Sequence, residues 1–363
     1  MSDNSTAKKP GKLKAFLIKK NIILSGKRYF IDAMGAMANG LFASLLIGTI
    51  VSTLGQRLGI QVLIDIGNFA KGVAGPAMAV SIAYALQAPP LVLFSLLAVG
   101  SAANSLGKAG GPLAVFVIAI VATELGKLVS KETKVDILVT PLVTICSGVL
   151  MSIGIAPYIG EAASSVGKLI MWATELHPFL MGIVVSVVVG MILTLPISSA
   201  AICAALSLTG LAGGAAVAGC CAQMVGFAFM SYRENKVGGL VSQGLGTSML
   251  QMGNIVRNPR IWIPPTLAAA VTGPIATCVF KLRMDGEAIA SGMGTCGLVG
   301  QIGVYSGWIN SIAEGTKTAI TAFDWTGLVL ISLVLPAILS VVFCLILRKI
   351  GWIKENDLKL DNM

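Results

Sequence analysis

Long uncharged apolar runs alternate with short charged or glycine-rich segments along nearly the whole chain. A helix needs roughly 20 predominantly apolar residues to cross the hydrocarbon core of a bilayer. On this basis we expect an all-α integral membrane protein, a polytopic helical bundle of about 8–10 transmembrane helices. The predicted spans cover residues 29–54, 72–86, 90–102, 112–129, 137–159, 179–195, 200–231, 261–282 and 325–347.

Residues 194–219 interrupt this pattern. Their sequence, TLPISSAAICAALSLTGLAGGAAVAG, places Pro196, Ser198, Ser199 and several glycines inside an otherwise apolar stretch. Non-helical backbone at membrane depth is tolerated only where it is buried in protein or lines a cavity. In secondary transporters, apolar segments interrupted by Gly or Pro are the best sequence pointer to the substrate site. We therefore expect a helix broken near the middle of the bilayer, beside a solute path.

Several segments carry too few apolar residues to span. Residues 238–258 and 286–310 are glycine-rich, and they are predicted to be re-entrant. Residues 55–71 and 161–176 carry charges on a helical period, which indicates amphipathic helices at the membrane surface. Residues 13–24 resemble a short amphipathic helix on the inner leaflet, and a disordered basic tail is the alternative.

Composition supports the membrane assignment. Of 363 residues, 55% are hydrophobic and only 12% are charged, whereas charged residues make up about a quarter of a soluble domain. The net charge of +10 comes from basic residues that gather before the first span, after the last span and in short loops. No continuous basic face interleaved with aromatic residues is visible, so nucleic acid is not an expected partner.

The distribution of basic residues also predicts topology. Lys and Arg are enriched in cytoplasmic segments of membrane proteins, so both termini are expected in the cytoplasm of a multi-pass plasma-membrane protein embedded in lipid. The expected organisation is a basic cytoplasmic tail with an amphipathic helix over residues 1–28, a transmembrane transport domain over 29–348, and a cytoplasmic tail over 349–363.

The residues of soluble-enzyme chemistry are missing. The seven cysteines lie in apolar segments without CxxC spacing, and the chain has a single histidine. The motifs GxxxxGK[ST], HExxH and GxSxG do not occur. We expect no catalytic residues, no metal site, no disulfide framework and no cofactor.

Neutral polar residues in or beside the interrupted segments are the candidate solute ligands. A polar group buried without a partner costs several kcal/mol, so these groups bind either one another or a solute, and both alternatives stay open. The candidate substrate-binding residues are Asn39, His177, Pro196, Ser198, Ser199, Gln243, Asn254, Thr295 and Gln301, and the wider polar set adds Ser248 and Gln251.

Several ionisable residues have a structural interpretation that involves no solute. Arg28 and Asp32 are one helical turn apart, which favours a local ion pair. Glu124 and Lys127 close a predicted span and are expected to form a surface pair whose lysine reaches toward water. The alternative for His177 is an interfacial cap before Pro178.

Three stretches carry a family resemblance: KVDILVTPLVTICSG, PFLMGIVVSVVVGMILTLPISSAA and NPRIWIPPTLAAAVTGPIATCVF. Their order resembles the membrane-embedded IIC subunit of phosphoenolpyruvate-dependent sugar phosphotransferase systems, most nearly the fructose type. The resemblance covers nearly the whole chain. Within that group the chain is most similar to the standalone IIC-like proteins grouped with the membrane regulator of perfringolysin (PfoR-type).

The resemblance implies an alternating-access permease for a small sugar-like solute, a homodimer, and separate IIB and IIA phosphotransferase proteins as possible partners. Two departures matter. Ser198 and Ser199 stand where the family usually has Asn and Lys, and Thr295 is followed by Cys296 where the family has a sugar-binding Glu. Because Cys296 cannot replace a carboxylate, two hypotheses stay open: a permease that is at most the membrane component of a phosphotransferase complex, and a transport-inactive sensor or regulator.

Overall fold

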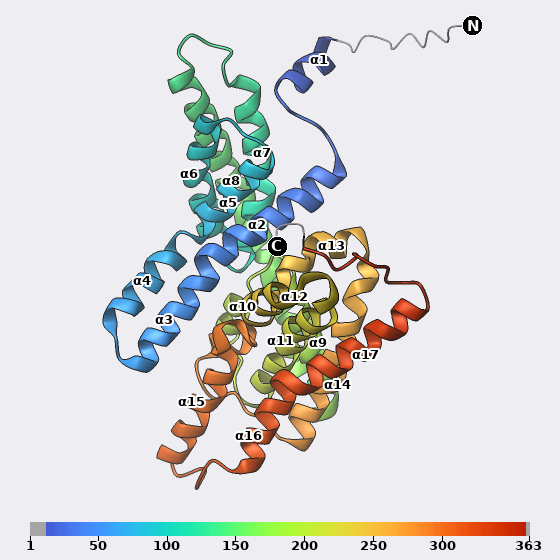
Figure 1. Ribbon diagram of the computed structural model, residues 1–363. Coiled ribbons are helices and arrows are strands. Elements are labelled where there is room, and N and C mark those ends of the chain that lie inside the picture. The colour runs from blue at the N-terminus through green and yellow to red at the C-terminus, as the bar shows by residue number, and fades with distance from the viewer. Residues whose placement is uncertain (1–11, 361–363) are drawn as a thin grey trace, which may run out of the picture.

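The computed structural model describes residues 12–360, and within them the chain is almost entirely helical, with no strand (Figure 1). This confirms the all-α class. The first part comprises α1 (Lys12–Lys19), α2 (Ala33–Leu41), α3 (Ile47–Leu58), α4 (Gln61–Gly72), α5 (Ala74–Ala85), α6 (Pro90–Gly107), α7 (Gly111–Val129) and α8 (Asp136–Thr174). The second comprises α9 (Pro178–Thr194), α10 (Ser199–Ala205), α11 (Gly210–Met230), α12 (Tyr232–Val241), α13 (Met252–Arg257), α14 (Ile263–Pro274), α15 (Val299–Ala313), α16 (Ala322–Val329) and α17 (Leu335–Lys349).

Six helical stretches of the described chain are long and apolar enough to cross a membrane, and α5 and α9 are shorter apolar helices. One stretch, Pro90–Val129, is divided at Lys108, whose φ of +47° ends α6 before α7 begins. The two helices then pack against each other. The polytopic prediction is thus confirmed, and the predicted boundary between these two spans is close to the observed one.

The helices form two packed groups (Figure 1). In the first group α5, α6, α7 and α8 pack around a buried aliphatic core, and α2 lies against α5. In the second group α9, α14 and α17 surround α11. Helix α11 is buried over almost its whole length, because glycine and alanine let its neighbours approach closely.

The predicted interruptions are present. Helix α9 ends at Thr194, the short α10 follows, and α11 begins at Gly210, whose φ of +66° is open to glycine. The glycine-rich segment 286–310 forms 3-10 turns over Ala288–Gly292 and Cys296–Leu298 before α15. Helix α10 packs directly against Ala288–Gly292, so the two breaks meet. The depth of these breaks in a bilayer stays a prediction.

One predicted boundary is wrong. Residues 161–176 were expected to form a separate interfacial helix, but α8 continues without a break through Pro157 to Thr174. Its 39 residues correspond to about 58 Å at 1.5 Å per residue, nearly twice the thickness of a hydrocarbon core. The helix stays continuous because neighbours pack along it; Gly160, for example, lies against the backbone of Gly107.

The other segments predicted at the membrane surface differ in outcome. Residues 55–71 turn at Gly59 and run back as α4 along α3, with Gly48 and Gly67 in close contact, so this segment forms a helical hairpin. The helix predicted over residues 13–24 is shorter than expected, because α1 ends at Lys19. Its position at the membrane surface stays a prediction. Residues 1–11 and 361–363 lie outside the described part of the chain, and with them the outer ends of both predicted tails.

Lys127 is buried, which contradicts the expected surface pair. Its side chain is 1% exposed, and its ammonium group lies 2.9 Å from Glu124 Oε2. It also donates hydrogen bonds to the backbone carbonyls of Asn21 (2.8 Å) and Leu86 (3.1 Å). The lysine therefore joins the N-terminal segment to the end of α5 instead of reaching toward water.

The close approach at Gly219 gives a prediction for stability. A Cβ atom at this position would lie 1.8 Å from the carbonyl oxygen of Ser186 on α9, so Gly219→Ala is expected to lower the stability by about 1–3 kcal/mol. Thermal unfolding of the detergent-solubilised protein measures the effect. Gly154→Ala on α8 is the control, because a Cβ there meets nothing within 4 Å; equal melting temperatures for both variants would contradict the packing of α9 on α11.

Candidate functional site

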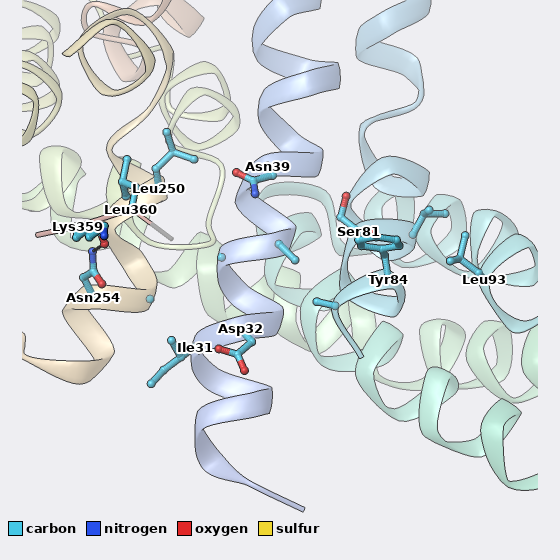
Figure 2. A pocket seen from close by; sticks show the side chains of 15 residues that line it. Ile31, Asp32, Asn39, Ser81, Tyr84, Leu93, Leu250, Asn254, Lys359 and Leu360 are labelled. Carbon is cyan, nitrogen blue, oxygen red and sulfur yellow. Dashed lines mark hydrogen bonds between the residues drawn. The ribbon is translucent and has the colours of Figure 1, made fainter. Parts of the chain in front are cut away.

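A cavity of about 680 Å³ lies between the first group of helices and the segment around α13 (Figure 2). Its polar lining comes from Asp32, Asn39, Ser81, Asn254 and Lys359. One wall belongs to the first group of helices, and the other belongs to α13 and to residues 359–360. A volume in this range fits a small organic ligand.

The helical period explains why α2 and the turn before it line this cavity. Asp32, Gly35 and Asn39 follow one another at intervals of three and four residues, so they share one face. Gly35 has no side chain to fill the space beside that face. Ser81 and Tyr84 lie three residues apart on α5 and face the same cavity (Figure 2).

The Asp32 carboxylate is the one acidic group in the cavity lining. The ion pair expected with Arg28 is absent, because the Arg28 guanidinium donates to Asn21 Oδ1 (3.1 Å) and to the Leu86 carbonyl (2.6 Å). Among the described residues no partner is recorded for the Asp32 carboxylate. An ionisable group within a membrane-spanning segment marks a functional site by default, and the position of Asp32 inside the predicted span 29–54 is the sequence signal for this site.

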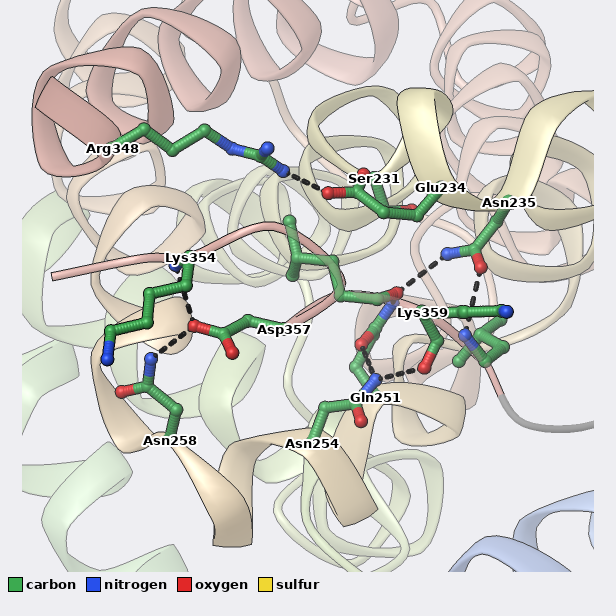
Figure 3. Close-up of polar contacts among 12 residues, drawn as sticks. Ser231, Glu234, Asn235, Gln251, Asn254, Asn258, Arg348, Lys354, Asp357 and Lys359 are labelled. Carbon is green, nitrogen blue, oxygen red and sulfur yellow. Dashed lines mark hydrogen bonds and ion pairs between the residues drawn. The ribbon is translucent and has the colours of Figure 1, made fainter. Parts of the chain in front are cut away.

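Asn254 belongs to a chain of buried amides. Gln251 donates to Gln243 Oε1 (2.8 Å), and Asn254 donates to Gln251 Oε1 (2.8 Å). Gln243 in turn donates to Ser231 Oγ (2.9 Å). The chain continues into the C-terminal segment, because Gln251 donates to the Leu358 carbonyl (3.0 Å) and Asn254 to the Lys359 carbonyl (2.9 Å) (Figure 3). Two of the predicted site residues, Gln243 and Asn254, are therefore linked through Gln251.

The serines of the interrupted segments form hydrogen bonds with backbone groups. Ser199 Oγ donates to the Gly292 carbonyl (2.6 Å), and Ser291 Oγ donates to the Leu208 carbonyl (2.6 Å). Ser198 accepts from the Ala201 amide (3.2 Å) and caps α10. Pro196 lies in the turn between α9 and α10. None of these residues lines the cavity.

The remaining candidates lie apart from it. His177 is exposed before Pro178, at the start of α9. Thr295 is fully buried, and its hydroxyl contacts the Met224 sulfur at 3.6 Å. Gln301 donates to the Cys221 sulfur at 3.2 Å, while its buried Oε1 has no partner. Only Asn39 and Asn254 of the predicted set share the cavity.

A second, more polar cavity of about 570 Å³ opens near α15 and α16. Trp308, Arg283, Asp285 and Lys317 line it together with further polar groups. The Arg283 guanidinium donates hydrogen bonds to the Asp285 carboxylate, and these bonds raise the pKa of the guanidinium. Residues 12–360 contain no cluster of three or more His, Cys, Asp or Glu side chains arranged to hold a metal ion.

Among comparisons with known proteins, only a family model matches the chain. A family model described as "Phosphotransferase system, EIIC" matches residues 31–360. The matched range includes every residue of the main cavity. No curated protein and no solved structure gives a significant match.

The amide chain predicts a cost for removing its central member. Gln251→Leu removes the hydrogen bond to Gln243 Oε1 and leaves that buried oxygen unpaired, and it takes one of the hydrogen bonds of Asn254 and of the Leu358 carbonyl, which is expected to destabilise the protein by about 1–3 kcal/mol. Gln301→Leu is the matched control, because its Oε1 is already unpaired and its amide meets only a sulfur atom. Differential scanning fluorimetry compares the two, and a larger loss for Gln301→Leu would show that the amide chain does not stabilise the fold.

Proposed function

The chain belongs to the EIIC family of the phosphotransferase system, and from this premise we propose that it is a permease for a neutral polyhydroxyl solute, a sugar or sugar-like compound, held between α2, α5 and α13. The observation that carries the proposal is the carboxylate of Asp32 in a cavity that also presents the amides of Asn39 and Asn254. These groups are hydrogen-bond partners for vicinal hydroxyls.

Asp32 supplies the carboxylate that this chain lacks at Cys296. In the family a glutamate meets the sugar hydroxyls, whereas Cys296 here is buried and apolar in its surroundings. A carboxylate accepts two hydroxyl hydrogen bonds at once, and such charge-assisted bonds are about twice as strong as neutral ones. The exposed ring of Tyr84 offers an apolar face beside them for the C–H groups of a sugar.

The cavity walls come from different halves of the chain, which suits alternating access. Asp32, Asn39 and Ser81 lie in the first half of the chain, whereas Asn254 lies on α13 in the second half. A solute bound by both walls loses contacts with one of them when the groups move apart. In transporter families, movement of one bundle against another around a fixed site opens that site to alternate sides.

The phosphoryl donor would be a separate IIB protein, itself charged by IIA. Five of the seven cysteines are buried, and none of the seven lines the cavity. We further propose that the protein is a homodimer with both termini in the cytoplasm, as the family resemblance and the basic terminal segments suggest. The solute would then meet the phosphorylated partner as it leaves the cavity toward the cytoplasm.

A second function, that of a transport-inactive sensor of the PfoR type, is favoured by one observation. The polar groups of the interrupted segments, Ser199 and Ser291 among them, are already satisfied by backbone carbonyls. A protein that binds solute without moving these segments would report its presence without flux. Uptake into proteoliposomes separates the two functions, because a sensor binds solute without accumulating it.

Asp32→Asn tests the proposed site. Loss of the charged acceptor is expected to weaken apparent solute affinity about 10- to 100-fold, equivalent to about 1.5–3 kcal/mol. The measurement is uptake of a panel of radiolabelled hexoses and hexitols into proteoliposomes, with and without phosphorylated IIB protein. Asp65→Asn is the control, since Asp65 lies on α4 and contacts Gln61 outside the cavity. Unchanged uptake in Asp32→Asn would exclude the carboxylate from solute binding.

A further inference from the structure

The segment that follows α17 returns to the cavity instead of leaving the protein. After Lys349 the chain runs to α12 and α13 (Figure 3), and Lys359 and Leu360 line the cavity described above (Figure 2). We propose that residues 352–360 form a strap that occupies the amide wall of the solute site and must leave before solute can reach that wall. This inference rests on the proposed function and concerns the regulation of the same site.

Backbone hydrogen bonds hold the strap at its far end. The Leu358 carbonyl accepts from Asn235 (2.7 Å) and from Gln251 (3.0 Å), and the Leu360 amide donates to Asn235 Oδ1 (2.9 Å). The Lys359 carbonyl accepts from Asn254 (2.9 Å). Three carboxamide side chains therefore bind three consecutive residues of the strap.

Side chains hold the rest of it. Leu358 is fully buried, and Ile353 and Leu360 are buried as well. Asn258 donates to Asp357 Oδ2 (2.8 Å) and to the Trp352 carbonyl (3.0 Å). These are contacts of a short non-helical segment with the ends of α12 and α13, so releasing the strap does not require any of the long helices to separate.

The strap takes the hydrogen bonds that a solute would use. Both donors of the Asn254 amide are engaged, one by Gln251 and one by the Lys359 carbonyl. Gln251 is likewise committed to Gln243 and to the Leu358 carbonyl. A hydroxyl group accepts from an amide in the same way as a backbone carbonyl does. Solute and strap therefore compete for the same donors, while Asp32 and Asn39 on the opposite wall stay open.

The experiment measures access to the amide wall without any solute. Gln251→Cys, introduced in a background where the exposed Cys146 and Cys278 are replaced by serine, reports access because position 251 is 0% exposed beneath the strap. The probe is the impermeant reagent methanethiosulfonate ethyltrimethylammonium. Leu358→Lys puts a charge at a fully buried anchor and is expected to raise the modification rate at least about tenfold.

Glu355→Gln is the matched control, because it changes the charge by the same amount at an exposed position of the strap. It is expected to leave the rate unchanged. Truncation after Gly351 removes the strap altogether and should raise the rate as much as Leu358→Lys or more. Asn39→Cys, on the exposed opposite wall, should react equally in all variants, and together with size-exclusion chromatography it verifies that each variant is folded.

Equal modification rates of Gln251→Cys in the intact, Leu358→Lys and truncated proteins would contradict the proposal that the strap covers the amide wall. Failure of the proposed function has a different signature. If labelling rises on strap release while Asp32→Asn leaves uptake unchanged, the strap does cover the amide wall, but the proposed solute site at Asp32 is wrong. If uptake depends on Asp32 but the labelling does not change, the site stands and the strap is a static part of the fold.

Discussion

Backbone polar groups inside a membrane must find partners within the protein, because lipid offers none. Two of the helix breaks in the second half of this chain, the one on either side of α10 and the one before α15, supply hydrogen-bond partners to each other. Gly210 and Met284 exchange two backbone hydrogen bonds (3.0 and 2.9 Å). Ser199 donates to the carbonyl of Gly292. Glycine is required at position 292, since a Cβ would lie 2.6 Å from the Ser199 backbone.

This mutual satisfaction decides where open space is left. The breaks pack against each other and against α11, so the polar side chains near them form hydrogen bonds within the protein. The cavity forms instead between α2 and α13, because Gly35 and Ala36 on α2 are too small to close the gap to α13. Asp32, at the edge of that gap, is thus left with a charge and no protein partner, which is the chemistry that a hydroxyl-rich solute needs.

Much of this architecture could be predicted from the sequence. The apolar runs gave the helical class, and Pro196 together with the glycines of 210–219 marked the break between α9 and α11. The charges of residues 161–176 on a helical period were misleading, because they indicated a separate interfacial helix where α8 continues to Thr174. The predicted surface position of Lys127 was wrong. A lysine near the end of a span usually reaches water, and only the fold brings the carbonyls of Asn21 and Leu86 to its ammonium group.

The site itself was predicted only in part. Asn39 and Asn254 were selected as polar residues in apolar surroundings and do line the cavity, whereas His177 does not. Asp32 was missed because Arg28, four residues earlier, offered a local partner that the structure commits elsewhere. Residues 352–360 show no period or motif, and their contacts with Asn235 and Gln251 join positions more than a hundred residues apart, which no local pattern encodes.

Cryo-electron microscopy of the protein in lipid nanodiscs, saturated with a solute identified by uptake, tests this account most directly. The account requires density for the solute in the cavity between α2 and α13, with its hydroxyls within hydrogen-bond distance of the Asp32 carboxylate. Density lodged between the turns at Ser199 and Gly292, with the cavity beside Asp32 empty, would contradict it.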